Sequence, residues 1–296
     1  CSNKMDGLLI TILIVTGFLV YKMISSSRKQ EGYKRWKATG SGDTANEETA
    51  GNKWKHGAWL RHALGVTTPK ARTYPVFDEE AVVWCAGLLG VEAVRLKEIL
   101  QDVSSHYREF WIRKRKGGYR MISAPDKELK SIQDTIYHRI LLPVNVHPVA
   151  TGFRRQHSIV DNVRPHLGKR CVLKTDIHDF FLSIRSPRVK QTFENIGYPK
   201  NISKVLGELC CRRRHLPQGA STSPALSNII AYEMDRKLAA MAEEFGLAYT
   251  RYADDLTFSG DVFPKEQVLV RVKEIIREEK FEPNHEKTRF LNEYDR

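Results

Sequence analysis

Two adjacent carboxylates interrupt a segment that otherwise has the composition of a β-strand. The stretch RYADDLTFSG, residues 251–260, sets Asp254 and Asp255 among strand-favouring residues such as Tyr252 and Phe258. Aspartate is also a common turn residue, because its side chain bonds the nearby backbone. The pattern therefore predicts a β-hairpin with an acidic turn. On its own, such a pair is more often structural than catalytic.

A third carboxylate changes this interpretation. The apolar stretch RCVLKTDI, residues 170–177, predicts a strand with Asp176 near its end. If the two strands are neighbours in one sheet, the three carboxylates can converge, and crowded carboxylates repel unless cations lie between them. Mg²⁺ prefers oxygen ligands, and two ions about 3.5–4 Å apart suit an in-line phosphoryl displacement. A cluster of Asp176, Asp254 and Asp255 would therefore imply a bound metal. Strand alternation would send Asp255 to the opposite face from Asp254, which makes it the weaker expected ligand.

Helical and strand-like patterns are mixed along the rest of the chain, and the central hairpin favours an α+β fold over a parallel doubly wound sheet. Apolar periodicity, with Gly and Pro as breakers, predicts further elements. These are two short helices in 78–100 broken by Gly87 and Gly90, a hairpin in 110–125, an amphipathic helix in 126–144 stopped by Pro143, one helix over 223–246, and a helix over 264–280.

The formal net charge of +13 suggests a polyanionic partner, either nucleic acid or an anionic membrane surface. Residues 7–24 are nearly all apolar and long enough to cross a bilayer, and the basic residues that follow them predict a cytoplasmic location for the rest of the chain. A cleaved signal peptide and a buried core helix are the alternatives. The expected organisation is a single-pass membrane anchor at 1–24, a flexible basic and polar linker at 25–72, and one globular domain at 73–296.

Two further motifs suggest contact with phosphates. The turn RKRKGGYR concentrates positive charge beside glycines, which allow a backbone to approach a phosphate closely. The segment LPQGASTSPALSN, residues 216–228, leads from a turn into a helix N-terminus, which favours anions. A solvated basic loop and a well-capped helix are the simpler explanations of these two motifs.

The order of these motifs resembles that of the reverse transcriptases, most closely the bacterial retron type. DIHDFF resembles motif A of that family, LPQGASTSPALSN motif B, YADD motif C and PNHEKTRF the motif D region. KGGYRMISAPDKELKSIQ and HPVATGFRRQHSIVDNVRPH resemble the fingers segments, and NVRPH (162–166) resembles the retron signature N-A-x-x-H, with Val163 where alanine is usual. The resemblance covers about residues 75–296.

The resemblance implies a right-hand polymerase with fingers at about 73–168 and 186–216 and a palm at about 169–185 and 217–296. The chain stops at Arg296, before the primer grip and thumb that the family would lead us to expect. The implied catalytic residues are Asp176, Asp254, Asp255 and Lys287, the lysine as proton donor to the leaving pyrophosphate. The implied substrate-binding residues are Lys114 and Arg120 for the triphosphate, Phe181 as the steric gate against a ribose 2′-OH, and Gln218 and Gly219 beside the nascent base pair. The implied nucleic-acid-binding residues are Arg113, Arg154, Arg155, Asn162 and His166; Asp179 is expected to be structural.

The function implied by the resemblance is RNA-directed DNA synthesis, in which dNTPs are added to a primer on an RNA template with two Mg²⁺ ions. Expected partners are the RNA template and primer, the RNA–DNA hybrid, dNTPs, the bacterial membrane and a retron effector protein. A retron would make branched RNA–DNA, called msDNA, in anti-phage defence. The alternatives are another bacterial reverse transcriptase class (group II intron-like, diversity-generating or abortive-infection), or a non-catalytic nucleic-acid-binding module tethered to the membrane.

Overall fold

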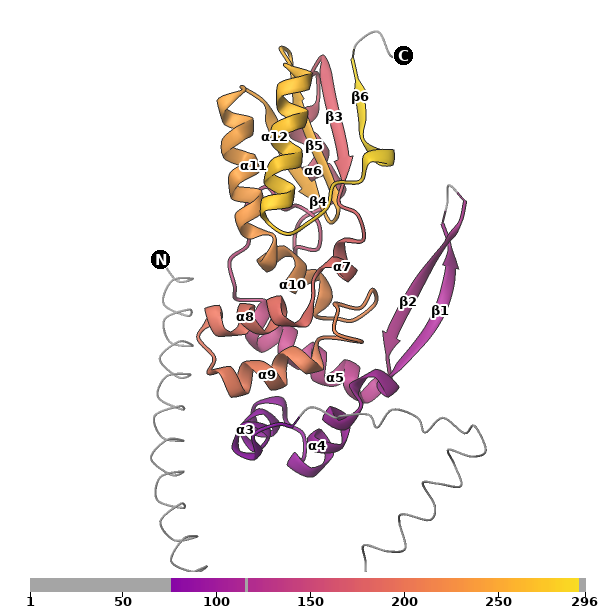
Figure 1. Ribbon diagram of the computed structural model, residues 1–296, viewed down its shortest axis with the longest axis vertical. Helices are drawn as coiled ribbons and strands as arrows, with labels where there is room; N and C mark the ends of the chain where they lie inside the picture. Colours follow the sequence, from indigo (N-terminus) through magenta and orange to yellow (C-terminus); the bar gives the residue numbers. More distant parts are fainter. Residues whose placement is uncertain (1–75, 115–116, 293–296) are drawn as a thin grey trace, which may run out of the picture. The chain divides into compact units, whose positions relative to one another are not determined.

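The computed structural model describes residues 76–114 and 117–292, which lie in a compact unit spanning Tyr74–Arg296 (Figure 1). Its longer helices run in chain order as follows: α3 (Glu79–Leu89), α4 (Ala93–Gln101), α5 (Lys127–Ile136), α8 (Ser186–Ile196), α9 (Lys200–Leu209), α10 (Ser223–Ile230), α11 (Tyr232–Glu244) and α12 (Lys265–Glu278). The short helices are η1 (Val103–His106), the π-helical η2 (Tyr137–Leu141), α6 (Ile159–Val163), η3 (Arg164–His166), α7 (Phe180–Ser183) and η4 (His285–Lys287).

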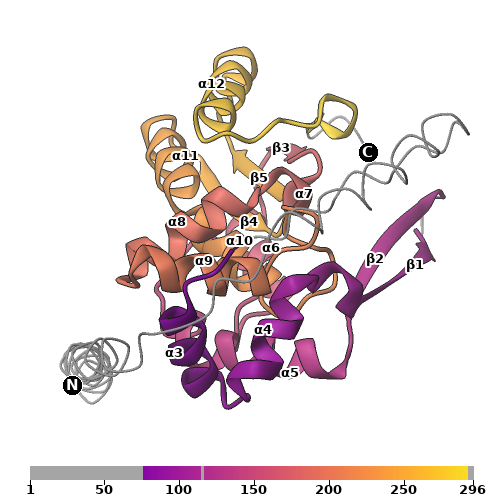
Figure 2. The same cartoon turned by 60° about the horizontal axis from the view of Figure 1, so that its bottom comes forward.

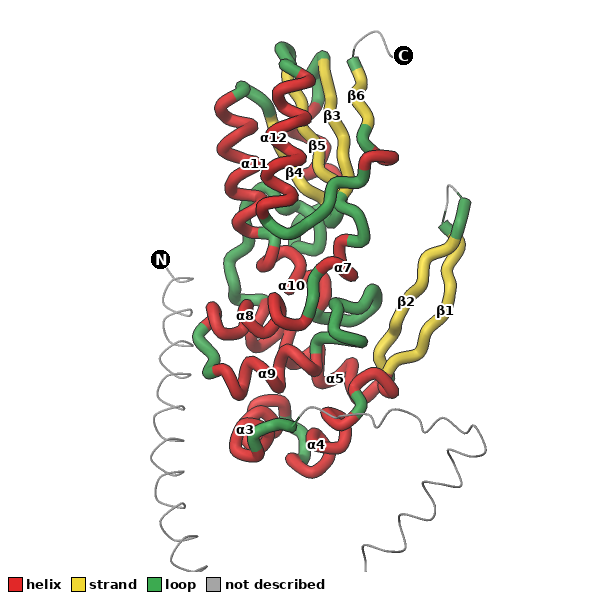
Figure 3. The backbone as a smooth tube through the Cα atoms, in the orientation of Figure 1, coloured by secondary structure: helices red, strands yellow, loops and turns green. Residues whose placement is uncertain are grey.

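A four-stranded antiparallel sheet organises the C-terminal part of the unit. Its strand order is β4 (Ala248–Tyr252), β5 (Asp255–Gly260), β3 (Cys171–Asp176) and β6 (Arg289–Leu291). Helices α11 and α12 run side by side along this sheet (Figures 1 and 3), where Leu256, Phe258 and Val272 are fully buried. Segments α6 and η3 also contact the sheet, through β4 and β5. The predicted antiparallel hairpin around Asp254 and Asp255 is therefore present, with β4 at the edge of the sheet and β5 inside it, between β4 and β3.

Helices α3, α4, α5, α8 and α9 form a second layer, and its buried side chains belong to the same apolar core as those of the sheet. Helices α8 and α9 pack against each other, and α3, α4 and α5 pack on α9 (Figure 2). Phe193 and Leu206 are fully buried there. The two-stranded hairpin of β1 (Tyr107–Arg113) and β2 (Tyr119–Pro125) extends from the end of this layer. The predicted hairpin in 110–125 is confirmed, and it begins three residues earlier than the predicted range.

The local chemistry explains where several helices begin and end. Asp78 caps α3 by accepting a hydrogen bond from the Ala81 backbone N–H at 2.9 Å, and Asp126 caps α5 in the same way. The predicted break between the first two helices falls at Gly90, whose φ of 70° is left-handed, whereas Gly87 lies inside α3. The amphipathic helix predicted for 126–144 ends earlier, because α5 passes into the π-helical turn before Pro143 is reached.

The prediction of one helix over 223–246 is wrong. The segment forms two helices, α10 and α11, which are separated at Ala231. Neither glycine nor proline lies at the break, so the sequence carries none of the usual marks of a helix end there.

The fold-class prediction is wrong in its N-terminal transmembrane helix. Across 76–114 and 117–292, no helix combines the length and the apolar character that a bilayer crossing requires. The predicted anchor at 7–24 and the linker at 25–72 lie outside the described residues. That prediction rested on apolar length alone, a property that a membrane span shares with other apolar helices. The transmembrane helix is therefore not part of the fold described here.

Candidate active site

The predicted acidic strand ends meet at one end of the four-stranded sheet. Strands β3 and β5 are hydrogen-bonded neighbours, and Asp176 is directly opposite Asp255 in their register. Directly opposed residues of an antiparallel pair point to the same side of the sheet. Asp254 precedes β5, in the turn from β4, and its carbonyl accepts a hydrogen bond from the Ile177 N–H at 2.9 Å. Asp254 lies in the turn and not in a strand, so strand alternation does not fix the side to which its carboxylate points relative to Asp255. The ranking of Asp255 as the weaker ligand stays a prediction.

The turn that carries Asp254 has little room around it. Ala253 and Asp254 join β4 to β5, and Ala253 has a φ of 59°, as the first central residue of a type II′ turn requires. Gly152 lies against this turn, and a Cβ atom there would come within 2.7 Å of the Ala253 nitrogen. The Gly152 carbonyl accepts a hydrogen bond from Asn228 Nδ2 at 2.9 Å. The close fit restricts the turn from both the sheet and the neighbouring loop.

The electrostatics of the site oppose ionisation of Asp254. Burial, followed by the nearby charge of Asp176 and a smaller effect of Asp255, raises the pKa of Asp254 from 3.8 to about 6. Asp254 itself is half-buried and Asp255 is exposed. A positive charge at this position would relieve the repulsion between the carboxylates.

Asp176 is buried, and its carboxylate has one cationic and one neutral polar partner in the segment after α12. Lys287 donates from Nζ to Asp176 Oδ2 at 2.7 Å, and Asn284 donates from Nδ2 to Asp176 Oδ1 at 3.0 Å. Burial alone would lower the pKa of Lys287, but the hydrogen bond to Asp176 and the surrounding carboxylates outweigh it and raise the pKa. Asn284 was missed by sequence reasoning, because an asparagine between proline and histidine is typical of a turn. Its place three residues before Lys287 was the available clue.

The carboxylates fit a magnesium site in part. Within the described residues, no group of three or more His, Cys, Asp and Glu side chains is arranged to hold a metal ion. Mg²⁺ is, however, usually held by one or two carboxylates together with waters and substrate phosphates. Asp176 and Asp254 provide such a pair, and a cation between them would offset the charge of Asp176 that, together with burial, raises the pKa of Asp254. The chemistry of the pair therefore fits Mg²⁺.

Phe181 lies in α7, five residues after Asp176 in the chain. Its ring centroid is 5.7 Å from that of Phe180 and 5.9 Å from that of Phe153. Contact with two rings restricts the Phe181 side chain, which is half-buried. Asp179 is the N-cap residue of α7, with a left-handed backbone and an exposed side chain whose Oδ2 lies 3.6 Å from His178 Nδ1.

The turn with Gln218 and Gly219 borders the second strand of the hairpin. The Ser123 N–H donates to the Gln218 carbonyl at 2.8 Å. Gly219 has a φ of 127°, and a Cβ atom there would lie 2.9 Å from Ile122 Cγ2. Only glycine meets both requirements.

The β1–β2 hairpin divides its basic residues between two faces. Arg120 is opposite Ile112 in the register, so their side chains lie on one face of the ribbon. Lys114 follows Ile112 by two residues and Ile122 follows Arg120 by two residues, so both share that face. Arg113 is opposite Tyr119 on the other face. All of the hairpin's basic side chains named here are exposed. The structure thus brings the two predicted triphosphate ligands together on the face that also contacts Gly219.

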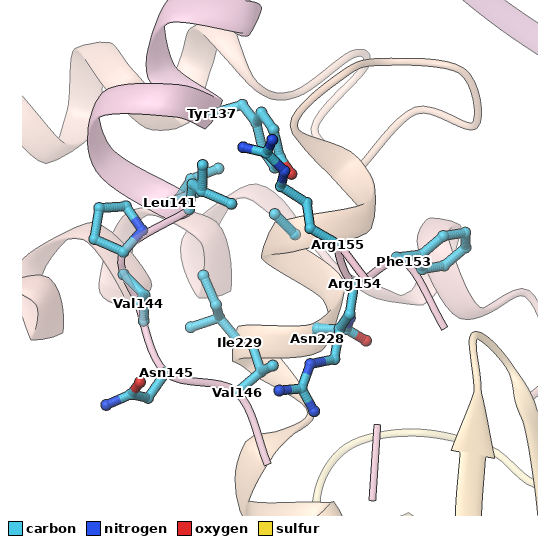
Figure 4. A pocket seen from close by; sticks show the side chains of 13 residues that line it. Tyr137, Leu141, Val144, Asn145, Val146, Phe153, Arg154, Arg155, Asn228 and Ile229 are labelled. Atoms are coloured by element: carbon cyan, nitrogen blue, oxygen red, sulfur yellow. The ribbon is translucent and has the colours of Figure 1, made fainter. Parts of the chain in front are cut away.

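Apart from Arg113 on the hairpin, the predicted nucleic-acid-binding residues separate into two pairs. Arg154 and Arg155 line a cavity of about 250 Å³ together with Tyr137 and Ile229 (Figure 4). Arg154 donates to the carbonyl oxygens of Pro148 and Ala150 at 3.4 and 3.3 Å. The assignment of both arginines to nucleic-acid binding stays a prediction.

Asn162 and His166 instead make hydrogen bonds to the four-stranded sheet and its supporting loop. The ring nitrogens of His166 lie 2.6 Å from Ser259 Oγ and 2.8 Å from Thr250 Oγ1. Asn162 Oδ1 accepts from Thr151 Oγ1 at 3.0 Å. These contacts tie α6 and η3 to the sheet, and a role of the two residues in nucleic-acid binding stays a prediction.

The comparisons with known proteins agree with this geometry. Residues 112–295 match the family described as "Reverse transcriptase (RNA-dependent DNA polymerase)". The chain is 39% identical to the retron Mx65 reverse transcriptase of Myxococcus xanthus over 62% of this chain and 48% of that protein. It is 37% identical to the retron Ec86 reverse transcriptase of Escherichia coli, over 60% of this chain and 55% of that protein. Identity to the retron Mx162 reverse transcriptase of M. xanthus is 31%, over 88% of this chain and 60% of that protein.

The matched region contains Asp176, Asp254, Asp255 and Lys287, together with β2 and the end of β1. The chain spans about half the length of the first two relatives, at 48% and 55%. The chain belongs to the reverse transcriptase family and is of the bacterial retron type.

Proposed function

We propose that this chain carries the catalytic centre of an RNA-directed DNA polymerase that adds dNTPs to a primer on an RNA template. The observation that carries the proposal is the meeting of Asp176 and Asp254 at one sheet end, where burial and the charge of Asp176 raise the pKa of Asp254 to about 6. Membership of the reverse transcriptase family supports the same reaction. The fingers would include the β1–β2 hairpin, and the palm would include the four-stranded sheet.

Asp176 and Asp254 would hold Mg²⁺. When bound, two Mg²⁺ ions would favour attack of a primer hydroxyl on the α-phosphate of the dNTP and offset the charge that develops on pyrophosphate. Lys287 is protonated at Nζ and lies at this centre through its bond to Asp176, so it would donate a proton to the leaving pyrophosphate.

The remaining site residues would select and orient the nucleotide. Lys114 and Arg120 would bind the triphosphate from one face of the hairpin, where both side chains are free to reach a ligand in solvent. The Phe181 ring, restricted by Phe153 and Phe180, would exclude a ribose 2′-OH. The backbone at Gln218 and Gly219 would border the nascent base pair.

Within the retron type, we extend the proposal to msDNA synthesis from a 2′-OH of the system's own RNA, and to anti-phage defence with an effector protein. Similarity to the Mx65 and Ec86 retron enzymes supports this extension. Sequencing of the RNA-linked DNA from cells that express the protein and its neighbouring RNA is the test. Linear DNA without a 2′-linked RNA branch would contradict retron-type priming.

Primer extension with purified protein tests the polymerase proposal itself. We expect Mg²⁺-dependent incorporation of dNTPs on an RNA template, and loss of incorporation by at least roughly a hundredfold in Asp176→Asn. Asp261→Asn is the matched control, because Asp261 pairs with Lys169 on the surface, away from the site. Template binding without incorporation in the wild type would favour the non-catalytic alternative.

A further inference from the structure

One arginine in the β4–β5 hairpin, whose turn carries Asp254, is completely buried. Arg251 lies in β4, and its side chain is among the largest fully buried side chains of the described residues, with 0% exposure. Transfer of a guanidinium and its partner carboxylate from water carries a large desolvation penalty, and a well-packed apolar pair is often at least as stable. The charge therefore calls for a role other than stability.

The guanidinium of Arg251 joins three elements. It donates to both carboxylate oxygens of Asp235 in α11, at 2.8 Å from Nε and 2.6 Å from Nη2. Its Nη1 donates to Asn228 Oδ1 in α10 and to the Ala253 carbonyl, each at 3.0 Å. Asp235 also accepts from the Tyr249 hydroxyl at 3.0 Å. The rigid fork of arginine makes these contacts simultaneously possible.

The hydrogen bond to the Ala253 carbonyl connects Arg251 directly to the catalytic turn, Ala253–Asp254, which joins β4 to β5. The Ala253 carbonyl belongs to the peptide group that joins Ala253 to Asp254, so its orientation fixes the start of the Asp254 residue. Asn228 supports the same turn from the other side, because it also donates to the carbonyl of Gly152, which lies against the Ala253 nitrogen. The turn is thus held between Arg251 and the Asn228–Gly152 pair.

We propose that Arg251, anchored by Asp235 and Asn228, is a positioning residue that holds the Ala253–Asp254 peptide so that the Asp254 carboxylate stays beside Asp176. Without such an anchor, the two like charges would move the turn outward. This inference rests on the proposed polymerase function. Arg251 does not touch the substrate; it acts through the backbone of the turn.

The test replaces Arg251 together with its partners Asp235 and Tyr249, so that neither charge is left buried alone. The triple variant Arg251→Met, Asp235→Leu, Tyr249→Phe removes both charges and the hydroxyl together, so that no buried charge is left unpaired, and it is expected to fold. Asn228 Oδ1 and the Ala253 carbonyl lose their Arg251 donor, so we expect a melting temperature modestly below that of the wild type. We also expect a fall in turnover of roughly 10- to 100-fold and an unchanged KM for dNTP. The rise in melting temperature on addition of Mg²⁺ should also shrink.

A second variant covers the case in which the triple variant does not fold. Arg251→Lys keeps the positive charge for Asp235, but an ammonium lacks the fork that also reaches Asn228 and the Ala253 carbonyl. It should show the same loss of turnover with KM retained. Val272→Ala is the control for stability alone: Val272 is a fully buried residue of α12, and its truncation should lower the melting temperature while turnover at low temperature is kept.

Wild-type turnover in either folded Arg251 variant, or an equal loss in Val272→Ala, would overturn the inference. These outcomes differ from a failure of the polymerase proposal, in which the wild type itself would incorporate no dNTP. An Mg²⁺-induced rise in melting temperature that is the same in wild type and Arg251→Lys would also contradict the inference, independently of activity.

Discussion

At the scale of single residues, Asp254 determines how the site responds to pH. The pKa of its carboxyl is about 6 in the folded protein, above the ordinary value of 3.8, because of burial and the charge of Asp176. The folded state therefore binds this proton more tightly than the unfolded state does. The resulting stabilisation is complete below about pH 3.8 and is lost as the pH rises through about 6. At pH 7 the ionised carboxylate destabilises the fold unless a cation is bound.

Asp254→Asn should therefore stabilise the metal-free protein at pH 7. A shift of this size corresponds to roughly 1–3 kcal/mol in the free energy of unfolding. The difference from wild type should disappear near pH 4, and Mg²⁺ should raise the melting temperature of the wild type more than that of the variant. Thermal unfolding in chelator and in Mg²⁺ from pH 4 to 8 measures both effects. A variant that is less stable than the wild type at pH 7 would contradict this account of the site.

Phe181 gives a prediction about sugar selection. Phe181→Ala removes the ring that Phe153 and Phe180 hold, so ribonucleotides should be incorporated more readily relative to deoxyribonucleotides, by about tenfold or more. Competition between dNTP and NTP in single-nucleotide extension measures the ratio. Leu182→Ala is the control, because Leu182 is the next residue of α7 and is exposed. An unchanged ratio in Phe181→Ala would exclude the gate role.

At the scale of elements, the sequence was sufficient for features that depend on local pattern. The hairpins, the strand that ends at Asp176 and the helix over 264–280 follow from alternation, periodicity and turn residues. The break at Ala231 and the contacts of Asn284, Gly152 and Arg251 were not predicted. Each depends on residues that are distant in the chain, and no local rule relates Gly152 to a turn a hundred positions away.

Gly152 provides the element-scale prediction. Gly152→Ala would place a Cβ atom 2.7 Å from the backbone nitrogen of Ala253, so the catalytic turn or the 149–152 loop must move. We expect a loss of about 1–3 kcal/mol in the free energy of unfolding and a fall in polymerase turnover. Gly87→Ala is the control, since a Cβ atom there meets nothing within 4 Å and helix α3 should become more stable. Equal activity in Gly152→Ala and wild type would show that the close approach is not required.

At the scale of the whole molecule, the formal net charge of +13 gives a prediction about RNA binding. Binding through phosphates releases counterions, so RNA affinity should fall steeply, by tenfold or more between about 50 and 200 mM salt. Arg113→Gln should reduce the slope of log affinity against log salt by about 1, whereas Arg271→Gln on α12 should not. Filter binding or anisotropy over a salt series measures the slopes. Affinity that does not depend on salt would contradict a phosphate-dominated interface.

At this scale, the net charge favoured a polyanionic partner, but composition did not predict how the rest of the chain is organised. Net charge and the acidic strand ends favoured a nucleic-acid enzyme, and the family match agrees. Apolar length at residues 7–24 led instead to a transmembrane helix that the described fold does not contain. The difference is physical: convergent charged residues imply a specific geometry, whereas an apolar run is compatible with more than one environment.

The central claim is that Asp254 is a catalytic carboxylate, and single-turnover incorporation of one dNTP on an RNA template tests it most directly. The comparison is between wild type, Asp254→Asn and Asp179→Asn. The last makes the same chemical change at an exposed left-handed position, which asparagine tolerates well. We predict that Asp179→Asn keeps the wild-type rate and that Asp254→Asn loses at least roughly a hundredfold. Equal rates for Asp254→Asn and wild type would contradict the account.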